Sequence, residues 1–177
     1  MRLFVTRFVA FVAALAVVVA ACGDGDAGPA EALPEVEPGT VEVEVETEIP
    51  YHEGDDRFGR RSGLVDVAAP TTEGPWPVVV AFHGDPRSVS KEWMRPTGMR
   101  VAEHGRVVFM PAWGHMDGSW SREVPLRTEW EALTDEIACA VAYAKAHAAD
   151  HGGDPNHITV YGFSAGGNAA LMAGLGD

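Results

Sequence analysis

The chain has 177 residues, of which 46% are hydrophobic, and this length favours a single domain of modest size. Its formal net charge of −13 disfavours binding to nucleic acid or to anionic membrane surfaces. The two cysteines, Cys22 and Cys139, lie in unrelated contexts and predict no disulfide framework; Cys139, among alanines, is expected to be a small buried residue. No cluster has metal-ligand spacing and no glycine-rich loop carries a phosphate-binding lysine, so neither a metal nor a cofactor is predicted.

The N-terminus has the features of a targeting segment. Arg2 and Arg7 precede an apolar stretch at 8–21, which is shorter than the roughly 20 residues that a membrane span needs. Small residues at 19–21 then precede Cys22, and this pattern resembles the lipobox of bacterial lipoproteins. The resemblance implies cleavage before Cys22 and lipidation of that cysteine, which would anchor the protein to a lipid bilayer. The alternative is an ordinary signal peptide cut nearby, and both interpretations predict an exported protein, either a cell-envelope lipoprotein or a secreted one.

A change in composition at residue 22 and another near residue 41 divide the chain into three parts. Residues 1–21 are the predicted signal peptide. Residues 22–40 are rich in glycine, proline, alanine and acidic residues without apolar periodicity, and they are predicted to form a disordered acidic tether. Residues 41–177 are predicted to form the folded domain.

The first elements of that domain are predicted to be strands. Valine and glutamate alternate at 41–46, as in a half-exposed edge strand, and residues 64–68 are its expected antiparallel partner. Residues 78–82 and 107–110 are continuous apolar runs, which are typical of strands buried on both faces. A helix is expected within 88–104, with Pro96 near its first turn and Gly105 at its C-cap.

A second helix is predicted from about Thr128, which with Glu131 resembles a capping box. Its apolar residues recur at intervals of three and four and would form one buried face: Trp130, Leu133, Ile137, Val141, Ala144 and Ala148. A strand at 158–161 and a helix from Ala165 follow. Strands and helices that alternate from residue 78 onward predict an α/β fold with a mostly parallel sheet and flanking helices.

The motif that organises the domain is G-x-S-x-G at 162–166, centred on Ser164. The serine falls between a predicted strand and a predicted helix, the context of a nucleophile elbow. Glycines on both sides allow strand and helix to approach closely, and the start of the helix supplies free N–H groups where an oxyanion would form. A second motif lies upstream, where the strand at 78–82 runs into His83, Gly84 and Asp85.

These motifs carry a family resemblance. Residues 152–167, which read GGDPNHITVYGFSAGG, are similar to the nucleophile region of carboxylesterases and of bacterial feruloyl or acetyl esterases. The wider stretch 41–174 resembles the esterase/lipase branch of the α/β-hydrolase superfamily. The resemblance implies that Ser164 is the nucleophile and that backbone N–H groups of Ala165 and of Gly84 or Asp85 form the oxyanion hole. Asp85 departs from the pattern, because many relatives have glycine there.

In this superfamily the catalytic acid and histidine follow the serine. Only 13 residues follow Ser164, and they contain Asp177 and no histidine. The chain is therefore interpreted as the N-terminal half of a C-terminally truncated hydrolase domain, and as given it is expected to be inactive. Trp113, His115 and Trp120 occupy a predicted loop on the catalytic side and would line a substrate pocket, although packing at its rim is an equal alternative for the tryptophans.

The sequence thus predicts an exported serine hydrolase that cleaves carboxylic esters, small or polymeric, through an acyl-enzyme on Ser164. One alternative is an extracellular depolymerase of polyesters or feruloyl esters. Another, from a different class, is a lipoprotein that keeps the hydrolase fold as a binding surface without catalysis.

Overall fold

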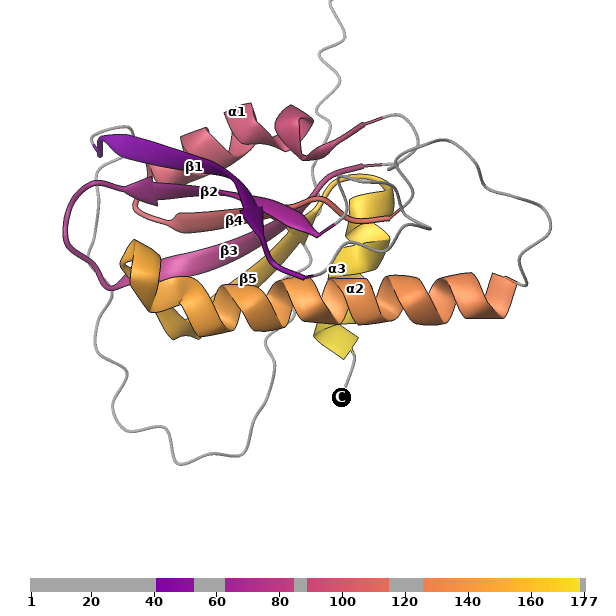
Figure 1. Cartoon of the computed structure of the whole chain (residues 1–177). Helices are drawn as coiled ribbons and strands as arrows, with labels where there is room; N and C mark the ends of the chain where they lie inside the picture. The colour runs from indigo at the N-terminus through magenta and orange to yellow at the C-terminus, as the bar shows by residue number, and fades with distance from the viewer. Residues whose placement is uncertain (1–40, 53–62, 85–88, 115–125, 176–177) are drawn as a thin grey trace, which may run out of the picture.

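The computed structural model describes residues 41–52, 63–84, 89–114 and 126–175, with residues 126–132 described by their backbone alone (Figure 1). The elements in chain order are β1 (Val43–Pro50), β2 (Leu64–Pro70), β3 (Trp76–Phe82), α1 (Lys91–Ala102), β4 (Val107–Pro111), α2 (Leu126–His147), the 3₁₀ turn η2 (Ala148–His151), β5 (Gly153–Gly162) and α3 (Ala165–Leu175). The predicted strands and helices are all present among these residues.

The five strands form one mixed sheet in the order β1-β2-β4-β3-β5. The antiparallel pairing of β1 with β2 is confirmed, and β1 lies at the sheet edge, as its alternating sequence predicts. β2 also pairs antiparallel with β4, whereas β3 lies parallel to both β4 and β5. The α/β architecture with flanking helices is therefore confirmed, with its parallel part confined to β4, β3 and β5.

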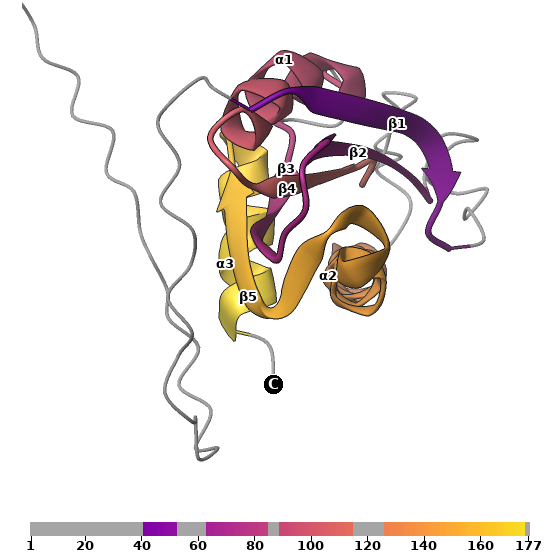
Figure 2. The ribbon, with the colours of Figure 1, turned by 90° about the vertical axis from the view of Figure 1, so that its left-hand side faces the viewer.

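Helices cover both faces of the sheet (Figures 1 and 2). α1 packs on one face, while α2 and α3 lie together on the other. The sequence of β4 is continuously apolar because the strand is buried on both faces. Val107 and Phe109 belong to the core under α2, and Val108 and Met110 belong to the core under α1. A strand buried on both faces has no solvent side on which polar residues would be favoured.

α1 begins earlier than the position of its proline suggests. Pro96 is the sixth residue of the helix rather than a residue of its first turn, so that prediction is wrong. The helix C-cap is Glu103, and Gly105, with φ +70°, lies two residues beyond it rather than at the cap. In the helix middle, a Cβ atom on Gly98 would lie 2.3 Å from the sulfur of Met110, so this glycine allows α1 to sit close to β4.

The apolar stripe predicted for α2 is confirmed where side chains are described. Leu133, Ile137, Ala144 and Ala148 are buried, and Val141 is partly buried against them. Two other predictions for this region are wrong. α2 already begins at Leu126, so Thr128 does not precede the helix as a capping residue, and Cys139 is exposed rather than buried because it lies off the stripe.

β5 forms the second edge of the sheet. Between two paired positions, Trp76–Gly153 and Val78–Ile158, β3 advances two residues and β5 advances five, so β5 carries three extra residues (5 − 2). Asp154 closes this bulge by accepting the N–H of Asn156 at 2.8 Å and contacting the His157 ring.

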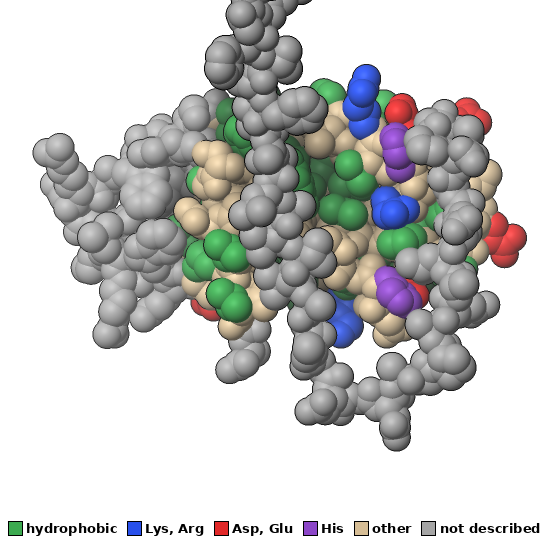
Figure 3. All heavy atoms as spheres, turned by 180° about the vertical axis from the view of Figure 1, so that it is seen from behind, with side chains coloured by type: hydrophobic (Ala, Val, Ile, Leu, Met, Phe, Trp, Pro, Cys, Tyr) green, Lys and Arg blue, Asp and Glu red, His purple; other side chains and the backbone are tan. Residues whose placement is uncertain are grey.

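The side of the molecule on which β5 and α3 lie is partly apolar. Hydrophobic side chains gather there in Figure 3. Large exposed side chains of these two elements include Tyr161, Leu171 and Leu175. Within the described ranges, none of the helices combines the length and the apolar character required to cross a membrane.

Candidate active site

The sheet register brings the two sequence motifs together. Phe82 is paired with Gly162 at the ends of the parallel strands β3 and β5. Gly84 and Ser164 each lie two residues beyond that pair, so they leave the same edge of the sheet side by side. The following helices diverge, since α1 packs on one face of the sheet and α3 on the other. In open α/β sheets such a divergence of helices creates the crevice where ligands bind.

Ser164 occupies the sharp turn that its motif predicts. Its φ of 55° lies in the left-handed region, where a non-glycine residue is uncommon and costs on the order of 1–3 kcal/mol. The turn is held by the N–H of Phe163, which donates to the carbonyl of Phe82 at 3.2 Å, and by the N–H of Gly167, which donates to the carbonyl of Ser164 at 2.9 Å. Ser164 itself is exposed.

The flanking glycines are required by close backbone approach. A Cβ atom on Gly162 would lie 1.9 Å from the carbonyl oxygen of Gly166, and one on Gly166 would lie 2.3 Å from the carbonyl oxygen of Phe82. No side chain fits either distance. α3 therefore begins directly against the ends of β3 and β5, and the N–H of Ala165, the first residue of α3, adjoins the serine.

His83 fixes the start of the neighbouring loop. It is fully buried, and its Nδ1 lies 3.0 Å from the carbonyl oxygen of Gly84. Since a carbonyl only accepts, Nδ1 carries the proton and Nε2 does not. Burial lowers the pKa of His83 to about 4, although the hydrogen bond to Gly84 opposes that shift, so the ring is neutral at pH 7. Nε2 is buried and has no hydrogen-bond partner among the residues described.

Trp113, two residues after the end of β4, supports the same loop. It is only 5% exposed, and its indole N–H donates to the carbonyl of His83 at 3.2 Å. The indole also packs edge-on against Phe82, with ring centroids 6.0 Å apart. The residue after it, Gly114, donates its N–H to the buried carboxylate of Glu136 at 2.8 Å, which ties the end of β4 to α2. A substrate-lining role for Trp113 stays a prediction.

Two exposed aromatic side chains border the serine on the α1 side. Phe163 is 49% exposed, Trp93 is 50% exposed, and their ring centroids are 5.2 Å apart. Met94 of the same helix covers the sheet, whereas Trp93 contacts the serine turn. Sequence reasoning missed this pair, because a helical period does not reveal which helix faces a loop from another strand.

Four sequence-predicted residues lie outside the described residues: Cys22, Asp85, His115 and Trp120. The structure thus brings together Ser164, Ala165 and Gly84, and places Trp113 behind Gly84. Glu136 was not singled out from the sequence, because an acidic residue in an amphipathic helix is usually solvent-facing. Within the part of the chain that is described, no group of three or more His, Cys, Asp or Glu side chains is arranged to bind a metal ion.

Comparison with known proteins places this geometry in a family context. Residues 65–177, more than half of the chain, match the family model BD-FAE. The search of curated proteins found no match.

Similar solved structures include several esterases. An SN3-inhibited esterase B from Lactobacillus rhamnosis superposes with a TM-score of 0.59 at 20% identity, covering 81% of this chain and 41% of that one. The butyrate-bound thermophilic esterase Est2 from Thermogutta terrifontis has a TM-score of 0.52 at 22% identity, covering 74% and 43%. A bifunctional GH43-CE protein from Bacteroides eggerthii has a TM-score of 0.54 at 22% identity, covering 71% and 16%. The chain thus spans about two fifths of the length of the two esterases.

Proposed function

Because this chain belongs to the BD-FAE family, within the α/β-hydrolase superfamily, we propose that it carries the nucleophile and the oxyanion-binding part of a carboxylic ester hydrolase. The observation that carries this proposal is the strained backbone of Ser164, exposed between β5 and α3 and directly beside Gly84 at the end of β3. Strain at a surface serine is retained when it aims the hydroxyl at a reacting group.

In the proposed reaction the Ser164 hydroxyl oxygen attacks the ester carbonyl carbon while a base takes its proton. The negative charge that develops on the carbonyl oxygen is stabilised by backbone N–H groups, for which we propose Ala165 and Gly84 or Asp85. The carbon–oxygen bond to the alcohol then breaks, the base returns the proton to the alcohol, and an acyl-Ser164 ester remains. Water hydrolyses this ester by the same sequence and regenerates the serine.

The reaction also needs a general base that accepts the proton of the Ser164 hydroxyl. Histidine is the usual base in such sites, and no histidine follows Ser164 in the 177 residues. We propose that the base comes either from an upstream histidine, of which His115 is the candidate, or from polypeptide beyond this sequence. His83 is unsuitable, because its ring is fully buried and burial lowers its pKa to about 4, which makes it a weak base at pH 7.

The experiment uses the product of the complete reading frame and p-nitrophenyl acetate as substrate. Ser164→Ala is expected to lower kcat by a factor on the order of 10⁴ or more, because it removes the nucleophile and leaves only oxyanion binding. Incubation of the wild type with a fluorophosphonate should add one phosphonyl mass to the peptide that contains Ser164. Thr71→Val is the matched control, since it also deletes one hydroxyl, but Thr71 follows β2 and lies at the opposite end of the strands from Ser164.

Three results would separate the alternatives. Turnover that survives Ser164→Ala would overturn the proposed nucleophile. A well-folded wild type without turnover or fluorophosphonate labelling would favour the non-catalytic binding lipoprotein. Polymeric polyester or feruloyl-ester substrates, assayed in parallel, would identify a depolymerase.

We also propose that the protein is exported and anchored to a lipid bilayer through Cys22. The charged residues Arg2 and Arg7, the apolar stretch 8–21 and the small residues before Cys22 support this proposal. An ester hydrolase held at the cell envelope would act on esters from outside the cytoplasm.

A further inference from the structure

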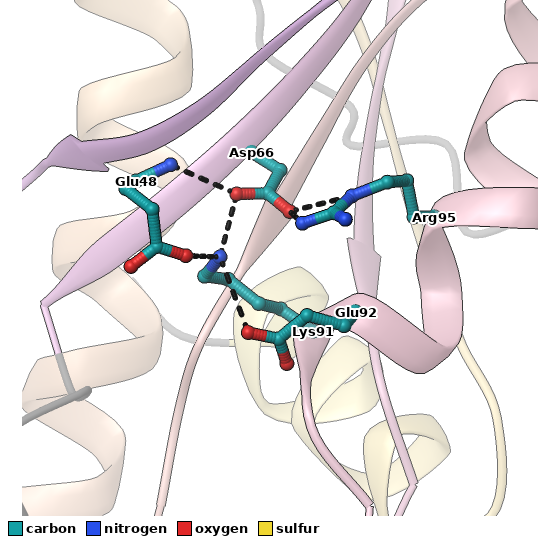
Figure 4. A network of polar contacts seen from close by, with 5 residues as sticks. All are labelled: Glu48, Asp66, Lys91, Glu92 and Arg95. Atoms are coloured by element: carbon teal, nitrogen blue, oxygen red, sulfur yellow. Dashed lines mark hydrogen bonds and ion pairs between the residues drawn. The ribbon is translucent and has the colours of Figure 1, made fainter.

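A network of charged side chains, of which Asp66 and Lys91 are buried, links β1, β2 and the first turns of α1 (Figure 4). At its centre is Asp66 of β2, which is fully buried. One carboxylate oxygen accepts the Nζ of Lys91 at 2.6 Å and the backbone N–H of Glu48 at 3.0 Å. The other accepts two N–H groups of Arg95, at 2.6 and 3.1 Å.

Lys91 is an unexpected residue at its position. It is the first residue of α1 and only 1% exposed, so its cation is removed from water at the helix end where the backbone dipole is positive. Burial lowers the pKa of Lys91, but hydrogen bonds to Asp66 and Glu48 outweigh that effect and the net pKa is raised. The amine is therefore charged, and both its charge and its position depend on the two carboxylates.

Stability alone does not account for such a network. A buried ion pair can often be replaced by apolar residues of similar volume without loss of stability, because desolvation of the charges offsets their attraction. What the network does supply is a fixed geometry. Lys91 and Arg95, one turn apart on α1, are both held to the single carboxylate of Asp66, and this sets the height of the helix above β2.

The start of α1 contacts the candidate active site directly. A Cβ atom on Gly84 would lie 3.3 Å from Val89, two residues before Lys91, and 3.3 Å from the ring of Phe163. Gly84 therefore lies between Val89 and the residue that precedes Ser164. Trp93, two residues after Lys91, packs against the same Phe163 ring. Displacement of the first turn of α1 would move both contacts.

We propose that Asp66 and Lys91 form a positioning pair for the active site. By fixing the first turn of α1, the pair holds Val89 against Gly84 and keeps the Gly84 backbone in place to bind the oxyanion. The inference rests on the proposed function, in which Gly84 or Asp85 donates to that oxyanion.

The test compares Lys91→Met with Arg95→Met in the product of the complete reading frame. Each variant removes one of the two α1 cations that bind the Asp66 carboxylate, and in each variant Asp66 keeps the other cation. Lys91 is two residues from Val89, which touches Gly84, whereas Arg95 is six residues from Val89. Lys91→Met is expected to lower kcat for p-nitrophenyl acetate about 10- to 100-fold with KM changed less than about threefold, because misplacement of a group that acts in the transition state lowers kcat. Arg95→Met is expected to keep kcat within about twofold at a similar thermal midpoint.

A double variant separates a loss of kcat from a loss of stability. In Asp66→Asn/Lys91→Met both buried charges of the pair are removed, so the fold is expected to keep a thermal midpoint near that of the wild type, while kcat stays as low as in Lys91→Met. A purely structural role would instead restore kcat together with the midpoint. Wild-type kcat in Lys91→Met, or equal losses of kcat in Lys91→Met and Arg95→Met, would overturn the proposal.

Ser164→Ala, run alongside, separates this inference from the proposed function. If the wild type has no Ser164-dependent turnover, hydrogen exchange of the Trp93 backbone amide, which donates to the carbonyl of Ser90 at 3.0 Å, decides the structural part. This amide is expected to exchange about tenfold faster in Lys91→Met than in Arg95→Met, because local opening no longer breaks the buried pair. Equal exchange in the two variants would contradict the positioning role.

Discussion

At the scale of single residues, the glycines around Ser164 differ in how much space their surroundings leave for a side chain. Gly166→Ala would place a methyl group 2.3 Å from a backbone oxygen, whereas the nearest atom to a methyl group at the adjacent Gly167 lies at an ordinary 3.7 Å. Gly166→Ala is expected to destabilise the protein by several kcal/mol, about 3 or more, because backbone must move. Gly167→Ala is expected to be neutral or stabilising by about 0.5–1 kcal/mol, since alanine favours the helix.

Urea unfolding of both variants checks this prediction, with the free energy of unfolding as the measured quantity. Equal free energies of unfolding for the two alanine variants would contradict the close approach of α3 to the end of β3.

The lowered pKa of the buried His83 ring is expected to make the stability of the fold depend on pH. Its pKa falls from 6.5 in the unfolded chain to about 4 in the fold, mainly through burial, so between these values the unfolded chain binds a proton that the folded chain excludes. Stability from this group is therefore complete above pH 6.5 and is lost as the pH falls toward 4. Between pH 7 and pH 4.5 the wild type is expected to lose about 2–3 kcal/mol more than His83→Asn, whose amide still has an N–H to donate to Gly84.

The measurement is the free energy of unfolding of both proteins at the two pH values, supported by direct NMR titration of the His83 ring. A ring that titrates near pH 6.5 would show that His83 is open to water.

At the scale of elements, the end of β1 is tied to the end of β4 by one buried hydrogen bond. The Tyr51 hydroxyl donates to the carbonyl of Ala112 at 2.7 Å, just before Trp113 and the candidate site. Tyr51→Phe is expected to lower the free energy of unfolding by about 1–3 kcal/mol, because the carbonyl is left buried without its donor. Tyr143→Phe, which deletes the hydroxyl of a partly exposed tyrosine on α2, is the control and is expected to cost less than about 0.5 kcal/mol.

Thermal and urea unfolding of the two phenylalanine variants provide the check. If both variants lost the same free energy, the link from Tyr51 to Ala112 would contribute nothing particular to the junction of β1 and β4.

At the scale of the whole molecule, the proposed lipid anchor at Cys22 can be tested by mutation. The chain has a second cysteine, Cys139, which provides a matched control. In a bacterial host, Cys22→Ala is expected to abolish processing or to release the protein from the membrane fraction, since the proposed lipid anchor requires that thiol. Cys139→Ala, which changes an exposed cysteine of α2, is expected to leave processing and membrane retention unchanged.

Mass spectrometry of the N-terminal peptide and fractionation of the cells supply the readout. Unchanged mass and retention in Cys22→Ala would remove the lipoprotein proposal and leave the ordinary signal peptide.

The sequence by itself determined the order and type of the elements and the position of the strained serine. Strand alternation at β1, continuous apolar runs at β3 and β4, and the stripe on α2 each report a local period set by burial on one or two faces. Ser164 was predicted because its surroundings are local too: a strand, two glycines and a helix within a few residues. Errors occurred where a local signal competes with packing, as at Pro96, where tertiary contacts of Lys91 and Met94 extend α1 in front of a residue that usually opens a helix.

Only the tertiary structure decided which residues from separate elements meet at the serine. The pairing of Phe82 with Gly162 sets Gly84 beside Ser164, and no local pattern encodes the register between strands about 80 residues apart. The same holds for Trp93 on Phe163 and for the buried partners Asp66 and Lys91, which are 25 residues apart and read in sequence as ordinary surface charges. Their burial results from the packing of α1 against β2, β3 and β4, and the path of the chain between the strands decides that packing rather than the period of the side chains.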